Sequence, residues 1–100
     1  MITITSGDHS ITVEGHAGQA PIGHDIVCAG VSALVGALGA TIEANRDKWS
    51  SCELTVDSGI ARVSVSPKPE NTAYCDAIFD TIICGFGQIA ALYPDFVKYF

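Results

Sequence analysis

The sequence predicts a two-layer α+β domain of order ββαββα, in which an antiparallel sheet carries two helices packed on one face. The first observation is the pattern: two segments with strand-type alternation are each followed by a long, nearly uncharged helical segment. The second is the length of 100 residues, which suits a single domain over residues 1–100. The third is a hydrophobic fraction of 48% beside 16% charged residues, which suffices for a packed core.

The first hairpin is predicted at the N-terminus. Apolar and polar residues alternate over residues 2–5 and again over 11–13, and the turn-forming residues 6–8 lie between them. His9 lies in or near this turn, where we expect its side chain to be solvated. His16 falls at the far end of the second strand.

A long helix is predicted after a loop. Residues 17–24 contain glycine and proline and predict the loop, and loops of this length are often functional. Asp25 is the predicted N-cap of a helix that runs to about Asn45. Because the helix is apolar on all sides up to Glu43, we expect it to be central and buried. Its uncharged run 26–42 only reaches the lower limit of about 17 residues for a membrane span, so we expect no membrane insertion.

Glycines inside this helix predict the close approach of another element. Each costs about 1 kcal/mol relative to alanine in a helix interior. Close backbone packing on one helix face would compensate for that loss. The glycines are Gly30, Gly36 and Gly39.

The second hairpin follows Trp49, which we expect to pack where the preceding loop joins the sheet. Apolar and polar residues alternate over 54–56 and over 61–65, and residues 57–59 form the turn, which predicts strands with one polar face. Residues 66–69 contain two prolines, which end the second strand because proline cannot continue a ladder.

The second helix is predicted to begin at Asn71 or Thr72 and to run to about Leu92, with Pro94 as its stop. One apolar stripe is expected to face the core at a spacing of four residues. Its members are Tyr74, Ile78, Ile82 and Phe86. The aromatic tail 96–100 is expected to dock on the core or on a partner chain.

Charge and composition narrow the function classes. With a net charge of −6 the chain offers no basic patch, which argues against nucleic-acid binding. The apolar fraction is high for a small monomer, so we expect a homodimer. The first ten residues lack a basic region and a long apolar stretch, so we expect a cytoplasmic protein with reduced cysteines. Cys52, Cys75 and Cys84 are interpreted as small core residues.

Cys28 and His16 form the candidate site. Cys28 is predicted in the first turn of the helix, where free N–H groups and the helix dipole favour the nucleophilic thiolate. His16 could serve as its base if the loop folds back. Taken alone, each residue has a structural alternative, because a helical cysteine is often a core residue and a histidine is often a turn residue.

Neighbouring polar residues leave several roles open. Asp25 caps the helix or orients His16 as the third group of a triad. The charge of Asp25 opposes a thiolate at Cys28, so a protonated His16 would have to stabilise the anion. Ser32 lies one turn after Cys28 and faces the same cleft or packs on a strand. His24 is a rival base; a zinc site that includes it lacks a fourth ligand, and no cofactor is predicted.

The residues GHA at 15–17 and GHDIVCAGVSAL at 23–34 resemble the motifs of the Prp family of ribosomal-processing cysteine proteases. The resemblance covers most of the chain and implies that His16 and Cys28 are the catalytic dyad. We assign Asp25, Ser32 and Gly23 as orienting or substrate-binding residues.

The resemblance also implies a substrate and an assembly. Members of the family remove a short N-terminal extension from large-subunit ribosomal protein twenty-seven, cutting after an aromatic-rich apolar stretch. They are homodimers, and some process phage capsid or scaffold proteins. This chain departs from the pattern at Gly30, where the family usually has alanine, and at His24, which occupies a variable position. Neither change removes a dyad residue.

A mechanism follows as a hypothesis. His16 deprotonates Cys28, the thiolate attacks the scissile carbonyl, and water releases the acyl-enzyme. Backbone N–H groups around 27–29 are expected to hold the oxyanion, and the loop 18–23 is expected to close as a lid. The competing hypotheses are a non-enzymatic, dimeric, ribosome-associated binding module and a metal-binding protein.

Overall fold

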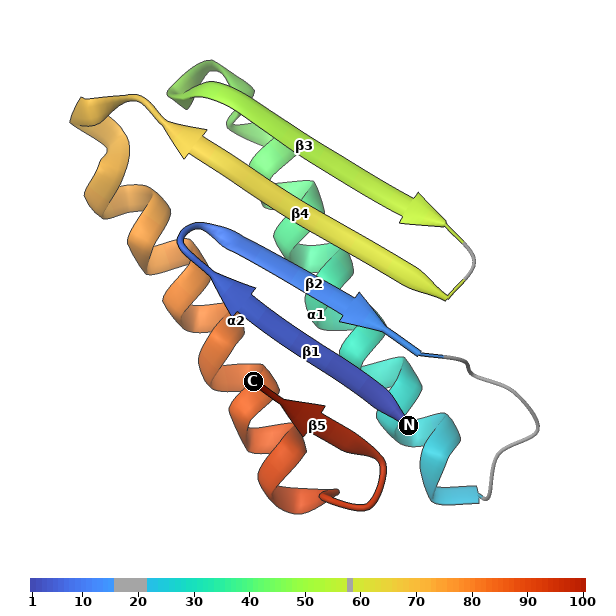
Figure 1. Ribbon diagram of the computed structural model, residues 1–100. Coiled ribbons are helices and arrows are strands. Elements are labelled where there is room, and N and C mark those ends of the chain that lie inside the picture. The colour runs from blue at the N-terminus through green and yellow to red at the C-terminus, as the bar shows by residue number, and fades with distance from the viewer. Residues whose placement is uncertain (16–21, 58) are drawn as a thin grey trace.

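Two long helices cover the same face of a five-stranded sheet in the computed structural model of the chain (Figure 1). The structure describes residues 1–15, 22–57 and 59–100, with side chains of the second range from residue 26 onward. The strands are β1 (Ile2–Gly7), β2 (Ser10–Glu14), β3 (Trp49–Asp57), β4 (Ile60–Pro67) and β5 (Val97–Tyr99). The helices are α1 (Ile22–Ala44) and α2 (Thr72–Leu92), and the 3-10 turns Arg46–Lys48 and Pro69–Asn71 precede β3 and α2. This arrangement confirms the predicted α+β class.

The sheet has the order β3-β4-β2-β1-β5, so the two hairpins join along β2 and β4. The pairs β1–β2 and β3–β4 are antiparallel, as predicted for the two hairpins, and the pair β2–β4 that joins them is antiparallel too. The tail adds β5 in parallel beside β1, which makes the sheet mixed rather than purely antiparallel. A strand of three residues shows too short an alternation to be recognised, so the sequence pattern did not predict β5.

The core lies between the sheet and the helices, and the strand alternation places it there. Ile4 and Ile11 on the first hairpin and Val63 on the second are buried, whereas their polar neighbours lie on the other face. Trp49 is buried where the 3-10 turn enters β3, as predicted, and its Nε1–H donates to the carbonyl of Ile42 at 2.9 Å. That bond satisfies the indole N–H inside the core.

α1 corrects two predictions. It begins at Ile22, so Asp25 lies inside the first turn and is not the N-cap. It is also not buried all round: Val31 and Leu38 face the core, whereas Ala33 and Ala37 are exposed. Small residues on the outer side made the helix seem uniformly apolar, although only one face is covered.

Both helices are long and apolar enough, by length and composition alone, to cross a membrane. In the described part of the chain each of them packs one face on the sheet, as Figure 1 shows. This is the packing expected of helices that cover a sheet in a two-layer domain.

Close helix packing occurs at a glycine of α2 and not where it was predicted. A Cβ added at Gly36 or Gly39 would meet no described atom within 4 Å, and at Gly30 it would only touch Ile89 at 3.4 Å. At Gly85 it would lie 3.0 Å from Leu34 Cδ1. Gly30, Gly36 and Gly39 of α1 therefore do not provide the close backbone packing that was predicted for them.

The buried stripe of α2 is shifted by one residue from the predicted one at its N-terminal end. The buried residues are Cys75, Phe79, Ile82 and Phe86. Tyr74 is 45% exposed and stacks on Trp49, with ring centroids 6.3 Å apart. The spacing of 3.6 residues per turn carries the stripe away from a strict period of four.

His9 is not solvated as expected, since its side chain is only 15% exposed. It adopts a positive φ of 53° in the β1–β2 turn, and its Nε2 lies 2.5 Å from Asp76 Oδ1 on α2. Its ring also packs edge-on against Phe79, with centroids 5.9 Å apart. The turn is thereby fastened to the second helix.

Candidate active site

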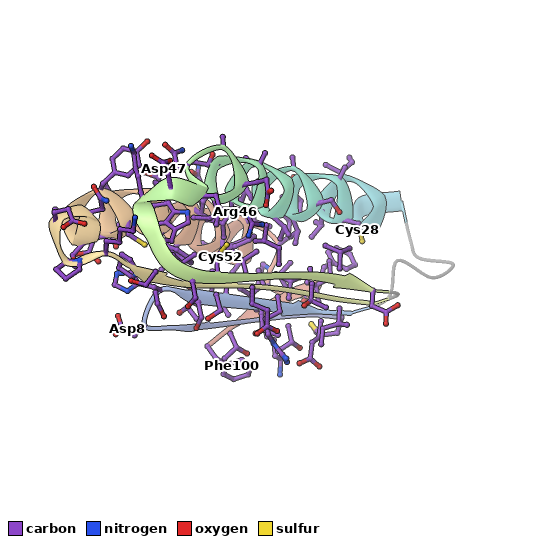
Figure 2. The ribbon with its side chains drawn as sticks, turned by 90° about the horizontal axis from the view of Figure 1, so that it is seen from above. Asp8, Cys28, Arg46, Asp47, Cys52 and Phe100 are labelled. Carbon is purple, nitrogen blue, oxygen red and sulfur yellow. The ribbon has the colours of Figure 1, made fainter. Side chains whose placement is uncertain are left out.

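Cys28 lies in the second turn of α1, on the side of the helix that faces the sheet (Figure 2). Its side chain is half-buried and lines a cavity of about 100 Å³. The other residues around this cavity are Ile2, Val13, Gly15, Val31 and Ser32. A partly exposed thiol in such a cavity can meet a bound reactant, whereas a sealed one cannot.

Gly15, in the cavity wall beside Cys28, occupies a position that requires glycine. Its φ is +153°, a conformation that L side chains rarely adopt. A Cβ there would lie 2.6 Å from the carbonyl oxygen of Met1 and 2.9 Å from Ile2 Cα. Its N–H donates to the carbonyl of Gly59 at 2.9 Å, which joins the end of β2 to the second hairpin.

The predicted site residues fall into two groups. Cys28 and Ser32 share the cavity, and Ser32 is exposed one helical turn further along α1. His16 and the predicted lid up to residue 21 lie outside the described residues, as do the side chains of His24 and Asp25. The backbone of Gly23 is helical and therefore belongs to α1 rather than to the loop.

The start of α1 at Ile22 changes the expected electrostatics. Cys28 is not in the first turn, where N–H groups lack helical partners. In an α-helix the N–H groups of residues 27–29 donate to the carbonyls of residues 23–25, so they are not available to an oxyanion. The prediction of an oxyanion hole at 27–29 is therefore wrong. Pro21 was the sequence signal for the earlier start, because proline is favoured at the start of helices.

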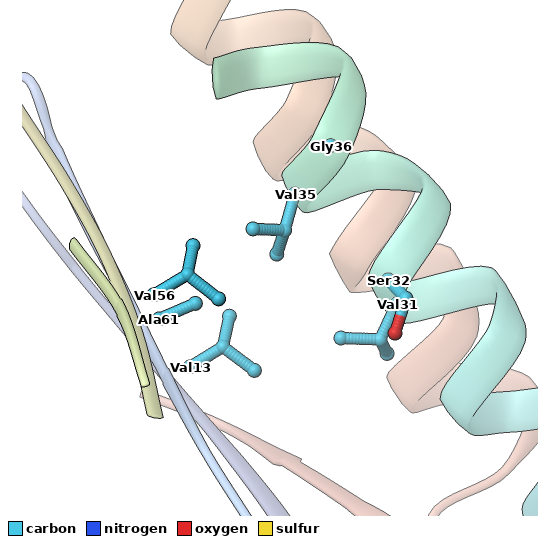
Figure 3. A pocket seen from close by; sticks show the side chains of 7 residues that line it. All are labelled: Val13, Val31, Ser32, Val35, Gly36, Val56 and Ala61. Carbon is cyan, nitrogen blue, oxygen red and sulfur yellow. The ribbon is translucent and has the colours of Figure 1, made fainter. Parts of the chain in front are cut away.

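A second, larger cavity of about 250 Å³ adjoins the first and lies between α1 and the sheet (Figure 3). The two cavities have Val13, Val31 and Ser32 in common. The remaining residues around the larger one are Val35, Gly36, Val56 and Ala61. The sequence pattern does not indicate these wall residues or Gly15, because their importance depends on which strand ends meet α1.

The remaining cysteines have other environments. Cys75 is fully buried on α2, and burial, with the nearby charges of Asp76 and Asp8, raises its thiol pKa to about 11. It is therefore a protonated thiol at neutral pH and a poor nucleophile. Cys52 is half-buried in β3, as a small core residue would be, whereas Cys84 is exposed on α2 and corrects its predicted place in the core.

Within residues 1–15, 26–57 and 59–100, no three His, Cys, Asp or Glu side chains gather where they could hold a metal ion. The zinc hypothesis depends on His16 and His24, whose side chains lie outside those ranges.

Comparison with solved structures finds the same fold. SMU.848 from Streptococcus mutans is 30% identical, with a TM-score of 0.76 over 99% of this chain and 91% of that chain. The essential ribosomal processing protease Prp from S. aureus, in complex with a substrate peptide, is 22% identical over 99% of this chain and 95% of that one, with a TM-score of 0.76. The same protease with a covalently linked product peptide is 25% identical over 99% and 97%, with a TM-score of 0.75.

A search of curated proteins gave no match. Residues 1–98 match the family described as cysteine protease Prp. A match of this length decides for an enzyme against the non-enzymatic binding module. The chain belongs to the Prp family and is a cysteine protease.

Proposed function

We propose that this protease removes a short N-terminal extension from a large-subunit ribosomal protein, with Cys28 as nucleophile and His16 as base. The observation that carries the proposal is the family match over residues 1–98. The S. aureus relative is described as a ribosomal processing protease, bound in one structure to a substrate peptide and in another to a covalently linked product peptide. A covalent product is what nucleophilic catalysis by a side chain leads to.

The position of Cys28 agrees with this role. Its thiol lines a cavity at the end of β2. Gly15, in the wall of that cavity, immediately precedes His16 in the sequence. Ser32 lies at the same cavity and can donate or accept a hydrogen bond there. We assign Asp25 to the orientation of His16 and Gly23 to substrate binding by its backbone.

The reaction has two steps. His16 takes the thiol proton of Cys28, and the thiolate forms a C–S bond to the scissile carbonyl carbon. The C–N bond then breaks, and the leaving amine takes the proton from His16. In the second step His16 takes a proton from water, the hydroxide attacks the thioester carbon, and the C–S bond breaks. The departing thiolate takes the proton back from His16, and the carboxylic acid product loses its proton to solvent.

Cleavage of a peptide that spans the N-terminal extension of ribosomal protein twenty-seven tests the proposal. We expect Cys28→Ala and His16→Ala each to lower kcat by at least about 10³-fold, the order of loss seen when one member of a catalytic unit is removed. Cys84→Ala, which removes an exposed thiol on the other helix, is the matched control and should cut at the parent rate. Undiminished cutting by either dyad variant would rule the assignment out.

Mass spectrometry of ribosomal and phage structural proteins after incubation with the protease identifies the natural substrate by its new N-terminus. A new N-terminus on the ribosomal protein supports the proposal. One found only on a capsid or scaffold protein would replace the ribosomal substrate by a phage substrate while leaving the proposed chemistry in place.

We further propose that the protease is a cytoplasmic homodimer. The exposed face of α1 is made of small uncharged residues such as Ala29, Ala33 and Ala37, a surface that another subunit can cover. Sedimentation velocity of the parent and of Ala37→Glu tests this: a dimer that the charged variant weakens supports the proposal, and a parent that stays monomeric at high concentration contradicts it.

A further inference from the structure

The helix layer has an outer side, which faces away from the sheet, and on that side α1 and α2 lie next to each other (Figure 1). The two helices run in opposite directions, because Leu34 lies next to Gly85 whereas Gly30, earlier on α1, lies next to Ile89, later on α2. We call the line along which residues 26–41 of α1 meet residues 78–92 of α2 the seam. The start of α1 and the end of α2 therefore lie at the same end of the seam.

The two ends of the seam differ in shape. At one end there is a groove of about 310 Å³, and none of the described residues that line it carries a charge. These residues are Ala37, Leu38, Thr41, Ile78, Thr81 and Ile82. At the other end lie Ile26 and Leu92, whose large apolar side chains are 63% and 65% exposed. The seam thus combines an apolar groove with two exposed apolar side chains.

The seam is uncharged although the chain is strongly acidic. No Asp, Glu, Lys or Arg occurs over residues 26–42 or 81–92, while the net charge of the chain is −6. Asp80 is exposed on α2, but it lies two residues from both Ile78 and Ile82, and residues two apart do not share a helix face. A second copy can therefore approach the seam without like-charge repulsion at the contact. A basic partner would gain no ion pair with the residues named here.

The groove and the exposed side chains are placed as a two-fold axis requires. Ile26 and Ala37 are eleven residues apart, as are Thr81 and Leu92, and this separation corresponds to about 16 Å of helix. A two-fold axis that crosses the middle of the seam therefore places Ile26 over the partner's Ala37 and Leu92 over the partner's Thr81. The same contact forms twice, as in any isologous interface.

The area of the seam suits a specific interface. Two helices about 30 Å long and about 10 Å wide present roughly 600 Å² on each copy. Two copies would together bury about 1,200 Å², which lies at the lower end of the range for stable, specific interfaces. The seam is therefore large enough to hold a second copy of the chain.

We propose that the seam between α1 and α2 is the interface of a symmetric dimer, in which Ile26 and Leu92 of each copy fill the groove of the other. The inference rests on the proposed homodimer and adds to it the surface, the register and the orientation of the two copies. The two sheets lie on the outside of this dimer. The cavity beside Cys28 lies on the sheet side of α1, so it stays outside the interface.

Charges at two matching positions test the interface by sedimentation velocity. Leu92→Glu and Thr81→Lys each place a charge against an apolar surface of the partner, so we expect each variant to raise the dimer dissociation constant at least about 10-fold. Both side chains are exposed, and a circular dichroism spectrum like that of the parent verifies folding. Thr55→Glu, which is exposed on β3, is the control and should dimerise like the parent.

Mixing the variants tests the register. In a mixed dimer of Leu92→Glu with Thr81→Lys, the introduced carboxylate meets the introduced ammonium group and the second contact is that of the parent. We therefore expect this mixture to dimerise again. Leu92→Glu mixed with Thr81→Glu is the matched control and should stay monomeric, because two carboxylates meet.

The outcomes separate this inference from the proposed homodimer and from the proposed reaction. A parent that dimerises together with single variants that dimerise equally well would overturn the seam and leave the homodimer in place. Weakened single variants without recovery in the Leu92→Glu and Thr81→Lys mixture would overturn the register. A parent that stays monomeric at high concentration would contradict both the seam and the homodimer, while peptide cleavage would still decide the roles of Cys28 and His16.

Discussion

The environments of the Cys28 and Cys75 side chains show which of these two thiols a substrate can reach. Cys28 lies half-buried at a cavity, whereas Cys75 is sealed in the core with a pKa raised to about 11. Both cysteines lie in helices among apolar neighbours, so the sequence alone predicts their helices and does not predict which thiol is buried. Tertiary packing makes the difference, because it buries Cys75 completely and leaves Cys28 at the wall of a cavity.

Gly15 is the residue whose replacement tests the geometry of the site most directly. Gly15→Ala combines an unfavourable φ with a contact of 2.6 Å to the backbone oxygen of Met1. We expect it to lower the free energy of unfolding by about 1–3 kcal/mol, measured by urea denaturation, because backbone strain of this kind costs that much. Cleavage should fall more than stability explains, since the end of β2 is displaced beside Cys28. Unchanged values of both would show that the strand end adapts freely.

The elements show where helix packing is tight and where it is loose. The glycines of α1 face open space or loose contact, and Gly85 of α2 receives Leu34. The sequence pattern predicted the helices and their approximate ends, but the glycines that it indicated for close packing lie on the wrong helix. A glycine lowers helix stability by a similar amount in the interior of either helix. Only the atoms packed against it therefore distinguish the glycines of α1 from Gly85.

A pair of substitutions checks this packing. Gly39→Ala should raise the free energy of unfolding by up to about 1 kcal/mol, because alanine is the better helix former and its Cβ meets no described atom within 4 Å. Gly85→Ala should not share that gain, because its Cβ would lie 3.0 Å from Leu34 Cδ1. Thermal and urea unfolding of both variants measure the difference. Equal stabilisation by the two changes would contradict the packing described here.

The whole molecule is closed by the last residues of the chain, which pair with the first ones. The N–H of Phe100 donates to the carbonyl of Ile4 at 2.8 Å, and Tyr99 Oη donates to Ser6 Oγ at 3.1 Å. Val97, at the start of β5, is buried in the core. β5 thereby protects one edge of the sheet and holds β1, whose first residue Ile2 lines the cavity of Cys28.

Truncation of the buried side chain of β5 tests this closure. Val97→Ala should lower the free energy of unfolding by about 2 kcal/mol, from two lost methyl groups at roughly 0.8 kcal/mol each and the cavity that they leave. Lys98→Ala, exposed on the same strand, is the control and should stay within about 0.5 kcal/mol of the parent. If Val97→Ala unfolds like the control, β5 contributes nothing to closure.

The sequence by itself determined the two hairpins, the two helices, the α+β class and the family, because alternation, periodicity and the motif around Cys28 are local patterns. Only the tertiary structure decided that the hairpins meet along β2 and β4, that β5 pairs in parallel, and that α1 exposes a small-residue face. It also decided that Gly15, Val13 and Ser32 surround the thiol. These features depend on contacts between residues far apart in the chain, and local pattern does not encode which strand end a helix will meet.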